Sequence, residues 1–223
     1  MNSNYICVYD FETASINPHR CQITQIGAMI LHPRTLKVVD TFNQECGVIT
    51  DPKKLEALGL DPVEQEALNV TRKTLEHLAT MPPEKIVWGE FKKFIKKYNP
   101  TSGTYKAPIP CGYNIINFDL IIHDRAAKMY GPDSGLFNRM FIMDGFQEFK
   151  AWTENNPDVV SHKLSDFAKF MGLPLSMLEN AHDALQDVKI TANCMIKLMH
   201  FKRSITKQTD FSKAFSNNKV YVE

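Results

Sequence analysis

One segment near the start of the chain constrains the fold more than any other. Residues 5–11 are apolar at almost every position on both alternating faces, which is typical of a strand that lies inside a sheet and is covered on both sides. Ile6 and Val8 share one face with Asp10 and Glu12, because side chains two positions apart on a strand point the same way. The opposite face takes Tyr5, Cys7, Tyr9 and Phe11.

The two acids at the end of this strand repel one another. Either one carboxyl group takes up a proton or a cation lies between the two. A buried strand that simply runs into a polar loop would give the same pair, so Asp10 and Glu12 alone leave both interpretations open.

Composition excludes several classes of protein. The 223 residues are 43% apolar and 23% charged, which is typical of one large globular domain with an appended element. No apolar run approaches the roughly 20 residues needed to span a bilayer, and residues 1–4 do not resemble a signal peptide. We therefore expect an intracellular, cytoplasmic protein without a membrane partner, with a nucleoid or nuclear location left open.

The cysteines and the net charge limit which kinds of bonding and binding site the chain can have. Five scattered cysteines without a CxxC pair argue against a disulfide framework or a zinc site. The net charge of +1 is low for a protein that clamps nucleic acid non-specifically. Bound divalent metals would supply local positive charge, so a nucleic-acid enzyme stays possible.

The order of the expected elements predicts an α/β fold with a central mixed sheet of about five strands flanked by helices. Three consecutive strands at 5–11, 23–31 and 35–46 predict an antiparallel meander. Residues 202–223 have weak periodicity and are expected to be a docking arm or a partly disordered tail. The remaining expected elements are helices at 62–68, 71–79 and 84–98, a strand at 109–112, a helix at 117–130, a strand at 141–144, and helices at 145–152, 164–171 and 183–201.

Further polar residues stand at expected helix starts. Asp119 lies in the first turn of a helix with Asn117 as its expected cap, where an acid also complements the helix dipole. Asp183 and Gln186 resemble a capping box, which predicts that a helix begins at Asp183.

His182 and Asp187 flank that expected helix start. They are five residues apart and cannot share a helix face. His182 is therefore predicted on the preceding loop, with Asp187 one turn into the helix. Taken alone, each of these residues has an ordinary structural explanation.

Taken together, the motifs resemble the DEDDh (DnaQ-like) 3′–5′ exonuclease family of the RNase H-like superfamily. The family motif D-x-E-T matches residues 10–13, the N-x-x-F-D core matches 114–119 with one extra residue, and H-x-A-x-x-D matches 182–187. The resemblance covers about residues 5–200. Tyr113 stands where family members often have a histidine, which leaves substrate preference open. Softer matches are at 25–28, 143–144, 162–164 and 67–71, where Asn69 replaces the usual glycine.

The resemblance implies an exonuclease domain over residues 1–201 and a two-metal site. Two divalent ions roughly 4 Å apart activate water and neutralise the phosphate, and Mg²⁺ prefers carboxylate ligands. Mn²⁺ is expected to substitute for Mg²⁺. His182 is implied as the general base, which works only without its extra proton, so activity is expected to rise with pH. The implied metal ligands, also counted as catalytic, are Asp10, Glu12, Asp119 and Asp187.

The resemblance also suggests where the 3′-terminal nucleotide lies. Phe11 and Leu68 are candidates to pack against bases, although Phe11 has the alternative of facing the core. The full set of candidate substrate contacts is Phe11, Thr13, Ala14, Leu68, Thr71 and Asn114. Four helix lysines either follow a phosphate backbone or form a solvated face; they are Lys92, Lys93, Lys96 and Lys97.

The expected function is two-metal removal of nucleotides from single-stranded 3′ ends of DNA or RNA. One alternative is a catalytically silent nucleic-acid-binding or polymerase-accessory module on the same fold. Another is an RNA-trimming or oligoribonuclease-type enzyme, because the contacts that read a 2′-hydroxyl cannot be found from spacing. A polymerase or a second copy of the chain is a conceivable partner of residues 202–223.

Overall fold

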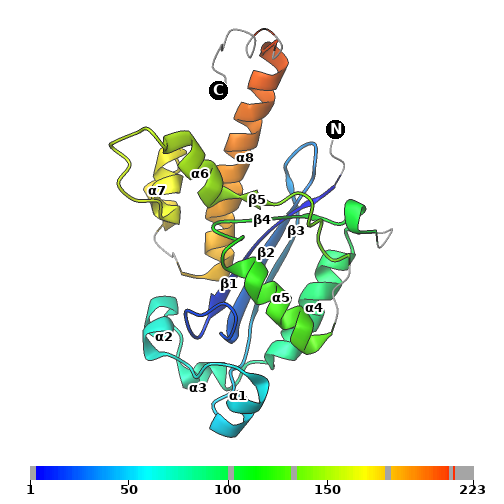
Figure 1. Ribbon diagram of the computed structural model, residues 1–223, viewed down its shortest axis with the longest axis vertical. Coiled ribbons are helices and arrows are strands. Elements are labelled where there is room, and N and C mark those ends of the chain that lie inside the picture. The colour runs from blue at the N-terminus through cyan, green and yellow to red at the C-terminus, as the bar shows by residue number, and fades with distance from the viewer. Residues whose placement is uncertain (1–3, 100–102, 132–134, 179–181, 211–212, 214–223) are drawn as a thin grey trace, which may run out of the picture.

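Five strands form one mixed sheet at the centre of the molecule (Figure 1). The computed structural model describes residues 4–99, 103–131, 135–178, 182–210 and 213. The strand order is β3-β2-β1-β4-β5, so β1 lies in the middle as predicted. The strands are β1 (Ile6–Thr13), β2 (Ile23–Leu31), β3 (Val38–Glu45), β4 (Ile109–Gly112) and β5 (Met143–Asp144).

Strand direction decides where the polar residues gather. β1, β2 and β3 form the predicted antiparallel meander. β4 runs parallel to β1, and β5 runs parallel to β4. The carboxyl ends of β1, β4 and β5 therefore meet at one edge of the sheet, and the acids that end or follow these strands lie near one another.

Helices cover both faces of the sheet (Figure 1). α4 and α5 pack on the face that carries Cys7, Tyr9 and Phe11, and α6, α7 and α8 pack on the face that carries Ile6 and Val8. The α-helices are α1 (Pro52–Leu58), α2 (Gln65–Thr71), α3 (Leu75–Leu78), α4 (Glu84–Lys96), α5 (Asp119–Tyr130), α6 (Gly145–Thr153), α7 (Leu164–Phe170) and α8 (Ala184–Gln208). Short 3₁₀ turns are η1 (Thr104–Lys106) and η2 (Leu175–Leu178).

The region between β3 and α4 differs from the prediction of helices at 62–68 and 71–79. α2 ends at Thr71 because Arg72 adopts a left-handed conformation, with φ of 57°, and its backbone N–H bonds to the Leu68 carbonyl. α3 then starts anew behind Thr74, whose side chain caps it. α1 was not predicted, although Asp51 and Gly59 cap its two ends.

Of the two predicted N-caps, the one of α8 is confirmed and the one of α5 is not. α8 begins behind Asp183, whose side chain accepts a hydrogen bond from the Gln186 backbone N–H at 3.0 Å, which confirms the predicted cap. The predicted cap of α5 is wrong. Phe118 holds the cap position without a side-chain bond, and the Asn117 amide donates to Asn114 Oδ1 at 2.9 Å instead.

α8 is longer than predicted. It continues to Gln208, so residues 202–208 of the predicted tail are helical. Apart from residue 213, the segment from 211 onward lies outside the described residues. No helix in the described part of the chain is long and apolar enough to cross a membrane.

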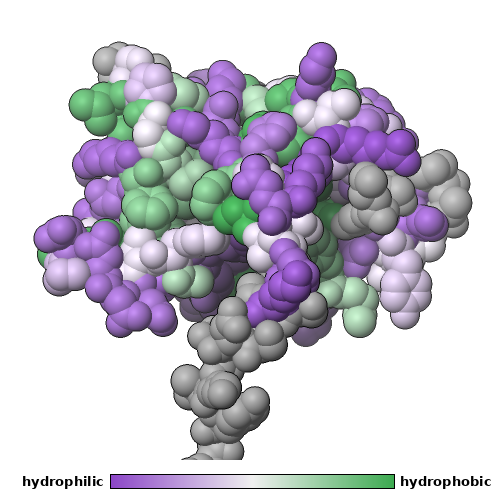
Figure 2. All heavy atoms as spheres, turned by 90° about the horizontal axis from the view of Figure 1, so that it is seen from above, coloured by the Kyte–Doolittle hydropathy of each residue, from purple (hydrophilic) through white to green (hydrophobic). Residues whose placement is uncertain are grey.

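A cavity of about 680 Å³ lies at the end of β1 opposite to Asp10 and Glu12. Its lining includes apolar residues such as Ile109 and Met195 and charged residues such as Arg34 and Lys207. Figure 2 views this end of the molecule and shows hydrophilic side chains around apolar ones. The cavity is therefore separate from the acidic edge of the sheet.

Candidate active site

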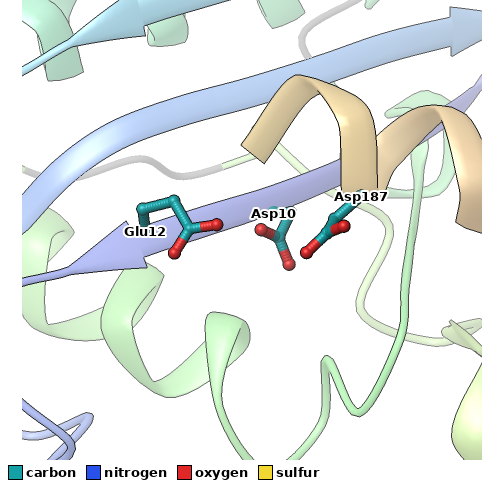
Figure 3. Close-up of side chains that lie close together, drawn as sticks. All are labelled: Asp10, Glu12 and Asp187. Carbon is teal, nitrogen blue, oxygen red and sulfur yellow. The ribbon is translucent and has the colours of Figure 1, made fainter. Parts of the chain in front are cut away.

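Three carboxylates converge at the carboxyl end of β1 (Figure 3). Asp10 and Glu12 come from one face of β1, and Asp187 comes from the first turn of α8. Each offers a carboxylate oxygen, and these oxygens lie within 4.8 Å of one another. Residues 175 positions apart in the sequence thus form one cluster that could hold a cation.

A glycine on β2 allows α8 to reach this position. Gly27 pairs with Asp10 across the strands. A Cβ atom at Gly27 would lie 2.5 Å from the carbonyl carbon of Ala184 and 2.7 Å from the backbone nitrogen of Leu185, which is closer than real Cβ contacts. Because Gly27 has no side chain, the start of α8 lies directly on the sheet and Asp187 lies beside Asp10.

Asp119 lies at the same end of β1, but it comes from α5, which packs on the opposite face of the sheet. It begins α5, is 2% exposed, and its Oδ1 accepts a hydrogen bond from the Phe11 backbone N–H at 2.9 Å. It lies outside the group of three whose oxygens are within 4.8 Å. Its charge is nevertheless the strongest neighbouring charge acting on Asp10. The structure therefore places the fourth predicted acid beside the cluster, where the backbone of β1 holds it.

Burial raises the pKa of every one of these acids, and nearby negative charges add to the effect. Burial, followed by the charges of Asp119 and Glu12, raises the pKa of Asp10 well above its usual range. Burial is also the main cause that raises the pKa of Glu12 to about 7, that of Asp119 to about 8 and that of Asp187 to about 6. The ionised cluster is therefore unfavourable by itself, and a bound cation would relieve it.

The donor set fits a hard divalent cation. Asp187 Oδ1 is buried and has no hydrogen-bond partner among the described residues, while Oδ2 accepts from the His182 backbone N–H at 3.3 Å. A buried acceptor without a partner is costly unless something outside the protein contacts it. Carboxylate oxygens without cysteine or histidine nitrogen suit Mg²⁺ or Mn²⁺.

His182 lies on the loop directly before the cap of α8, as predicted. Its side chain is exposed, and its backbone is left-handed with φ of 71°. This conformation is unusual for a residue with a side chain. It turns the backbone so that the N–H contacts the Asp187 carboxylate.

The predicted substrate contacts are more buried than expected. The Phe11 ring is 3% exposed and packs against Trp88 and Phe91, with ring centroids 6.3 and 5.9 Å apart. The expectation that Phe11 stacks on a base is therefore wrong, and its alternative in the core is what the structure has. Leu68 is 1% exposed, so packing of its side chain on a base is not available in this conformation either.

The other candidates line the same edge. Thr13 Oγ1 donates to the Ser15 carbonyl at 2.8 Å, and Thr71 Oγ1 donates to the Ala67 carbonyl at 3.1 Å. Asn114 has a left-handed backbone with φ of 59°. The side chains of Thr13, Ala14 and Thr71 are at most 9% exposed.

Asp144 was missed as a site residue, although the sequence places an acid at the end of a strand before a glycine. Its Oδ1 accepts from the backbone N–H groups of Asn114 and Phe146, both at 2.9 Å. Its Oδ2 accepts from the Ile116 N–H at 3.2 Å. Asp144 thus holds the turn that leads from β4 to Asp119.

The comparison with known families decides what kind of protein this is. A family model described as exonuclease, of the RNase T type, matches residues 7–195. The chain belongs to this exonuclease family. The match includes the three acids of the cluster and Asp119, and it ends within α8. A comparison of the chain with curated protein sequences found no match.

Solved structures agree on the fold. Escherichia coli exonuclease I with a dT13 oligonucleotide is 17% identical, with a TM-score of 0.67 over 87% of this chain and 40% of that chain. The zinc-bound complex of the same enzyme with single-stranded DNA is 18% identical, with a TM-score of 0.68 over 96% and 43%. A product-bound exonuclease I is 15% identical, with a TM-score of 0.66 over 87% and 43%. The fold is the predicted RNase H-like exonuclease fold, and this chain spans about two fifths of the length of those proteins.

Proposed function

We propose that the chain is a metal-dependent 3′–5′ exonuclease of the DEDDh type that removes nucleotides from single-stranded ends of DNA or RNA. The observation that carries the proposal is the cluster of Asp10, Glu12 and Asp187 at the carboxyl end of β1. The exonuclease family match supports the reaction class. The three sequence motifs support the DEDDh subtype and the direction of cleavage.

The acids are the proposed metal ligands. Asp10, Glu12 and Asp187 would hold a divalent ion, and Asp119 lies beside them to complete the set for a second. Mg²⁺ is the proposed ion, with Mn²⁺ as a substitute. When bound, such a pair supplies Lewis-acid stabilisation of the phosphate and a more acidic water.

His182 is proposed as the general base. It lies on the loop one residue before the cap of α8, and its backbone N–H contacts the Asp187 carboxylate. Its exposed imidazole is accessible from solvent and has the chemistry needed to accept the proton of an attacking water. The pairing of a ligand on a rigid helix with a base on the adjoining loop supports these two roles.

The proposed substrate is a single strand. The similar exonuclease I structures contain dT13 and single-stranded DNA, which supports this choice for a chain with the same fold. A catalytically silent binding module is the weaker alternative, because it would keep four buried and mutually repelling acids without using them.

The decisive experiment is digestion of matched single- and double-stranded DNA and RNA that carry a label at the 5′ end. We expect a ladder that shortens from the 3′ end of single strands in Mg²⁺ or Mn²⁺, release of mononucleotides, and no cleavage in chelator. Asp187→Asn is the matched control. Binding without cleavage in either metal would establish the silent module, and cleavage of RNA alone would establish the trimming enzyme.

A further inference from the structure

A row of three polar side chains crosses the sheet beside the acidic cluster. Glu12 on β1 pairs with Gln25 on β2, and Gln25 pairs with Glu45 on β3. Directly paired residues point to the same face, so all three side chains lie on the face that carries the cluster. Gln25 is 2% exposed, whereas glutamine side chains in proteins are mostly exposed to solvent.

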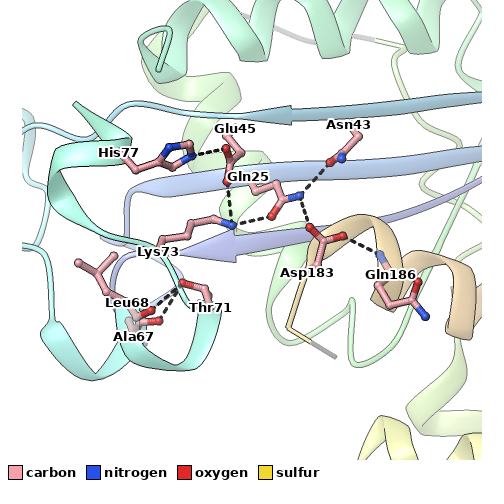
Figure 4. A network of polar contacts seen from close by, with 10 residues as sticks. All are labelled: Gln25, Asn43, Glu45, Ala67, Leu68, Thr71, Lys73, His77, Asp183 and Gln186. Atoms are coloured by element: carbon pink, nitrogen blue, oxygen red, sulfur yellow. Dashed lines mark hydrogen bonds and ion pairs between the residues drawn. The ribbon is translucent and has the colours of Figure 1, made fainter. Parts of the chain in front are cut away.

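Lys73 contacts two members of this row, Gln25 and Glu45 (Figure 4). It follows α2, and its side chain is 6% exposed. Its ammonium donates to Gln25 Oε1 at 2.7 Å and forms an ion pair with Glu45 Oε1 at 3.2 Å. The charge of Lys73 also acts on the Glu12 carboxyl, where it opposes the rise in pKa that burial and Asp187 cause.

The Gln25 amide extends the network to α8. Its Nε2 donates to Asp183 Oδ2 at 2.8 Å and to Asn43 Oδ1 at 2.9 Å (Figure 4). Asp183 is the residue that caps α8. A continuous set of polar contacts therefore joins the end of α2 to the start of the helix that carries Asp187.

Because the Lys73 ammonium is buried, its contacts with Gln25 and Glu45 favour one position of α2 over others. Removing a lysine from water is costly unless it is paired and hydrogen-bonded. Lys73 finds its acceptors on Gln25 and Glu45, so a displaced α2 would leave the ammonium without them. Glu45 is itself held by His77 Nε2 at 2.6 Å, which fixes the acceptor.

We propose that Lys73 is a positioning residue that holds α2 at a fixed place beside the carboxylate cluster and thereby shapes the binding site for the terminal nucleotide. The proposal rests on the proposed exonuclease function, because the resemblance to the exonuclease family suggests that the terminal nucleotide lies beside α2. The side chains of Leu68 and Thr71 are buried, so α2 would act through its position and not through stacking of these side chains on a base. Lys73 acts through α2 and the network, without a direct role in the reaction.

The test compares Lys73→Met with Lys202→Met in the full chain. Lys202 is a matched control, because it also pairs with a glutamate, Glu148 at 2.6 Å, but beside the cavity at the end of β1 opposite to the acids. For Lys73→Met we expect KM for a single-stranded oligonucleotide to rise about tenfold, the effect of one lost charge-assisted contact, with kcat within about threefold. Hydrogen exchange of residues 65–71 in the metal-free protein should become faster. Lys202→Met should change neither.

Each other outcome is informative. Kinetics and exchange equal to those of Lys202→Met would overturn the proposal, as would faster exchange without a change in KM. A fall in kcat with constant KM would show that Lys73 acts on the cluster and not through α2. If the wild-type chain lacks nuclease activity, the proposed function fails, while the exchange experiment still tests whether Lys73 holds α2. If Lys73→Met does not fold, Lys73→Gln keeps a donor for Gln25 Oε1 but loses the ion pair with Glu45, so it should show a smaller rise in KM and a smaller increase in exchange.

Discussion

The carboxylates of Asp10, Glu12 and Asp187 lie close enough to share one cation, and burial makes their charges unfavourable without it. A bound cation would therefore offset the unfavourable charges of these three residues. The buried Asp187 Oδ1 without a partner is the clearest sign of this dependence.

The raised pKa values predict how stability depends on pH. The pKa of Glu12 is about 7 and that of Asp187 about 6, above the usual values near 4 for unfolded chains. The metal-free folded state therefore holds protons that the unfolded state has lost, and this contribution to stability is lost as pH rises from about 4 to about 7. We expect Mg²⁺ to raise Tm more at pH 8 than at pH 5.5, measured against chelator. An equal increase at both pH values would contradict the prediction.

Removal of one ligand should separate activity from folding. Asp187→Asn keeps the shape of the side chain but lowers the charge of the cluster. We expect Mg²⁺-dependent cleavage to fall by about 10³-fold or more, as when one member of a catalytic set is removed. Because a like charge is gone, Tm in chelator at pH 8 should stay equal or rise. Full activity at saturating Mg²⁺ would refute the assignment of Asp187.

At the scale of elements, the position of α8 decides whether the cluster forms. Its first turn rests on Gly27, and Asp183 both caps the helix and bonds to Gln25 on β2. The helix start is thus held by close packing and by hydrogen bonds at the same place.

Gly27→Ala should disturb this contact. The new Cβ would meet backbone atoms of Ala184 at 2.5 Å, and backbone cannot move aside cheaply. We expect a loss of about 1–3 kcal/mol in the free energy of unfolding, as for other overpacked sites, together with loss of cleavage. Gly89→Ala is the control, because a Cβ there meets nothing within 4 Å. As a helical glycine, Gly89 should give a gain of about 0.5–1 kcal/mol and unchanged cleavage. Similar effects of the two variants would contradict this account.

At the scale of the whole molecule, a buried ion pair joins the helices of one face to the sheet. Glu84 on α4 pairs with Arg125 on α5 at 2.7 Å, and both side chains are at most 9% exposed. The same carboxylate accepts from the Ile23 backbone N–H on β2 at 2.9 Å. One acid thus connects two helices and a strand.

Arg125→Met should therefore be strongly destabilising. It leaves a buried carboxylate without its cation, which costs about 3–5 kcal/mol in comparable cases. Urea unfolding should show this loss. Arg20→Met, which breaks the more exposed pair with Asp61, should cost about 1 kcal/mol or less. Equal midpoints for the two variants would show that the buried pair contributes no more than the exposed one.

Features that depend on neighbours along the chain could be predicted from the amino-acid sequence alone. Alternation placed Asp10 and Glu12 on one face of a central strand, and capping chemistry located the start of α8 at Asp183. Both signals are local, because strand period and helix caps involve residues a few positions apart.

Contacts between distant segments became known from the folded chain and could not be predicted from spacing. The fold placed the Phe11 ring in the core, tied Asp119 to the backbone of β1 across 108 positions, and joined Gln25 to Asp183 across 158 positions. It also brought Lys73 into contact with the polar row, which no local pattern indicates. Such contacts depend on how the helices pack on the sheet, and that packing is set by shape and burial over the whole domain rather than by spacing along the chain.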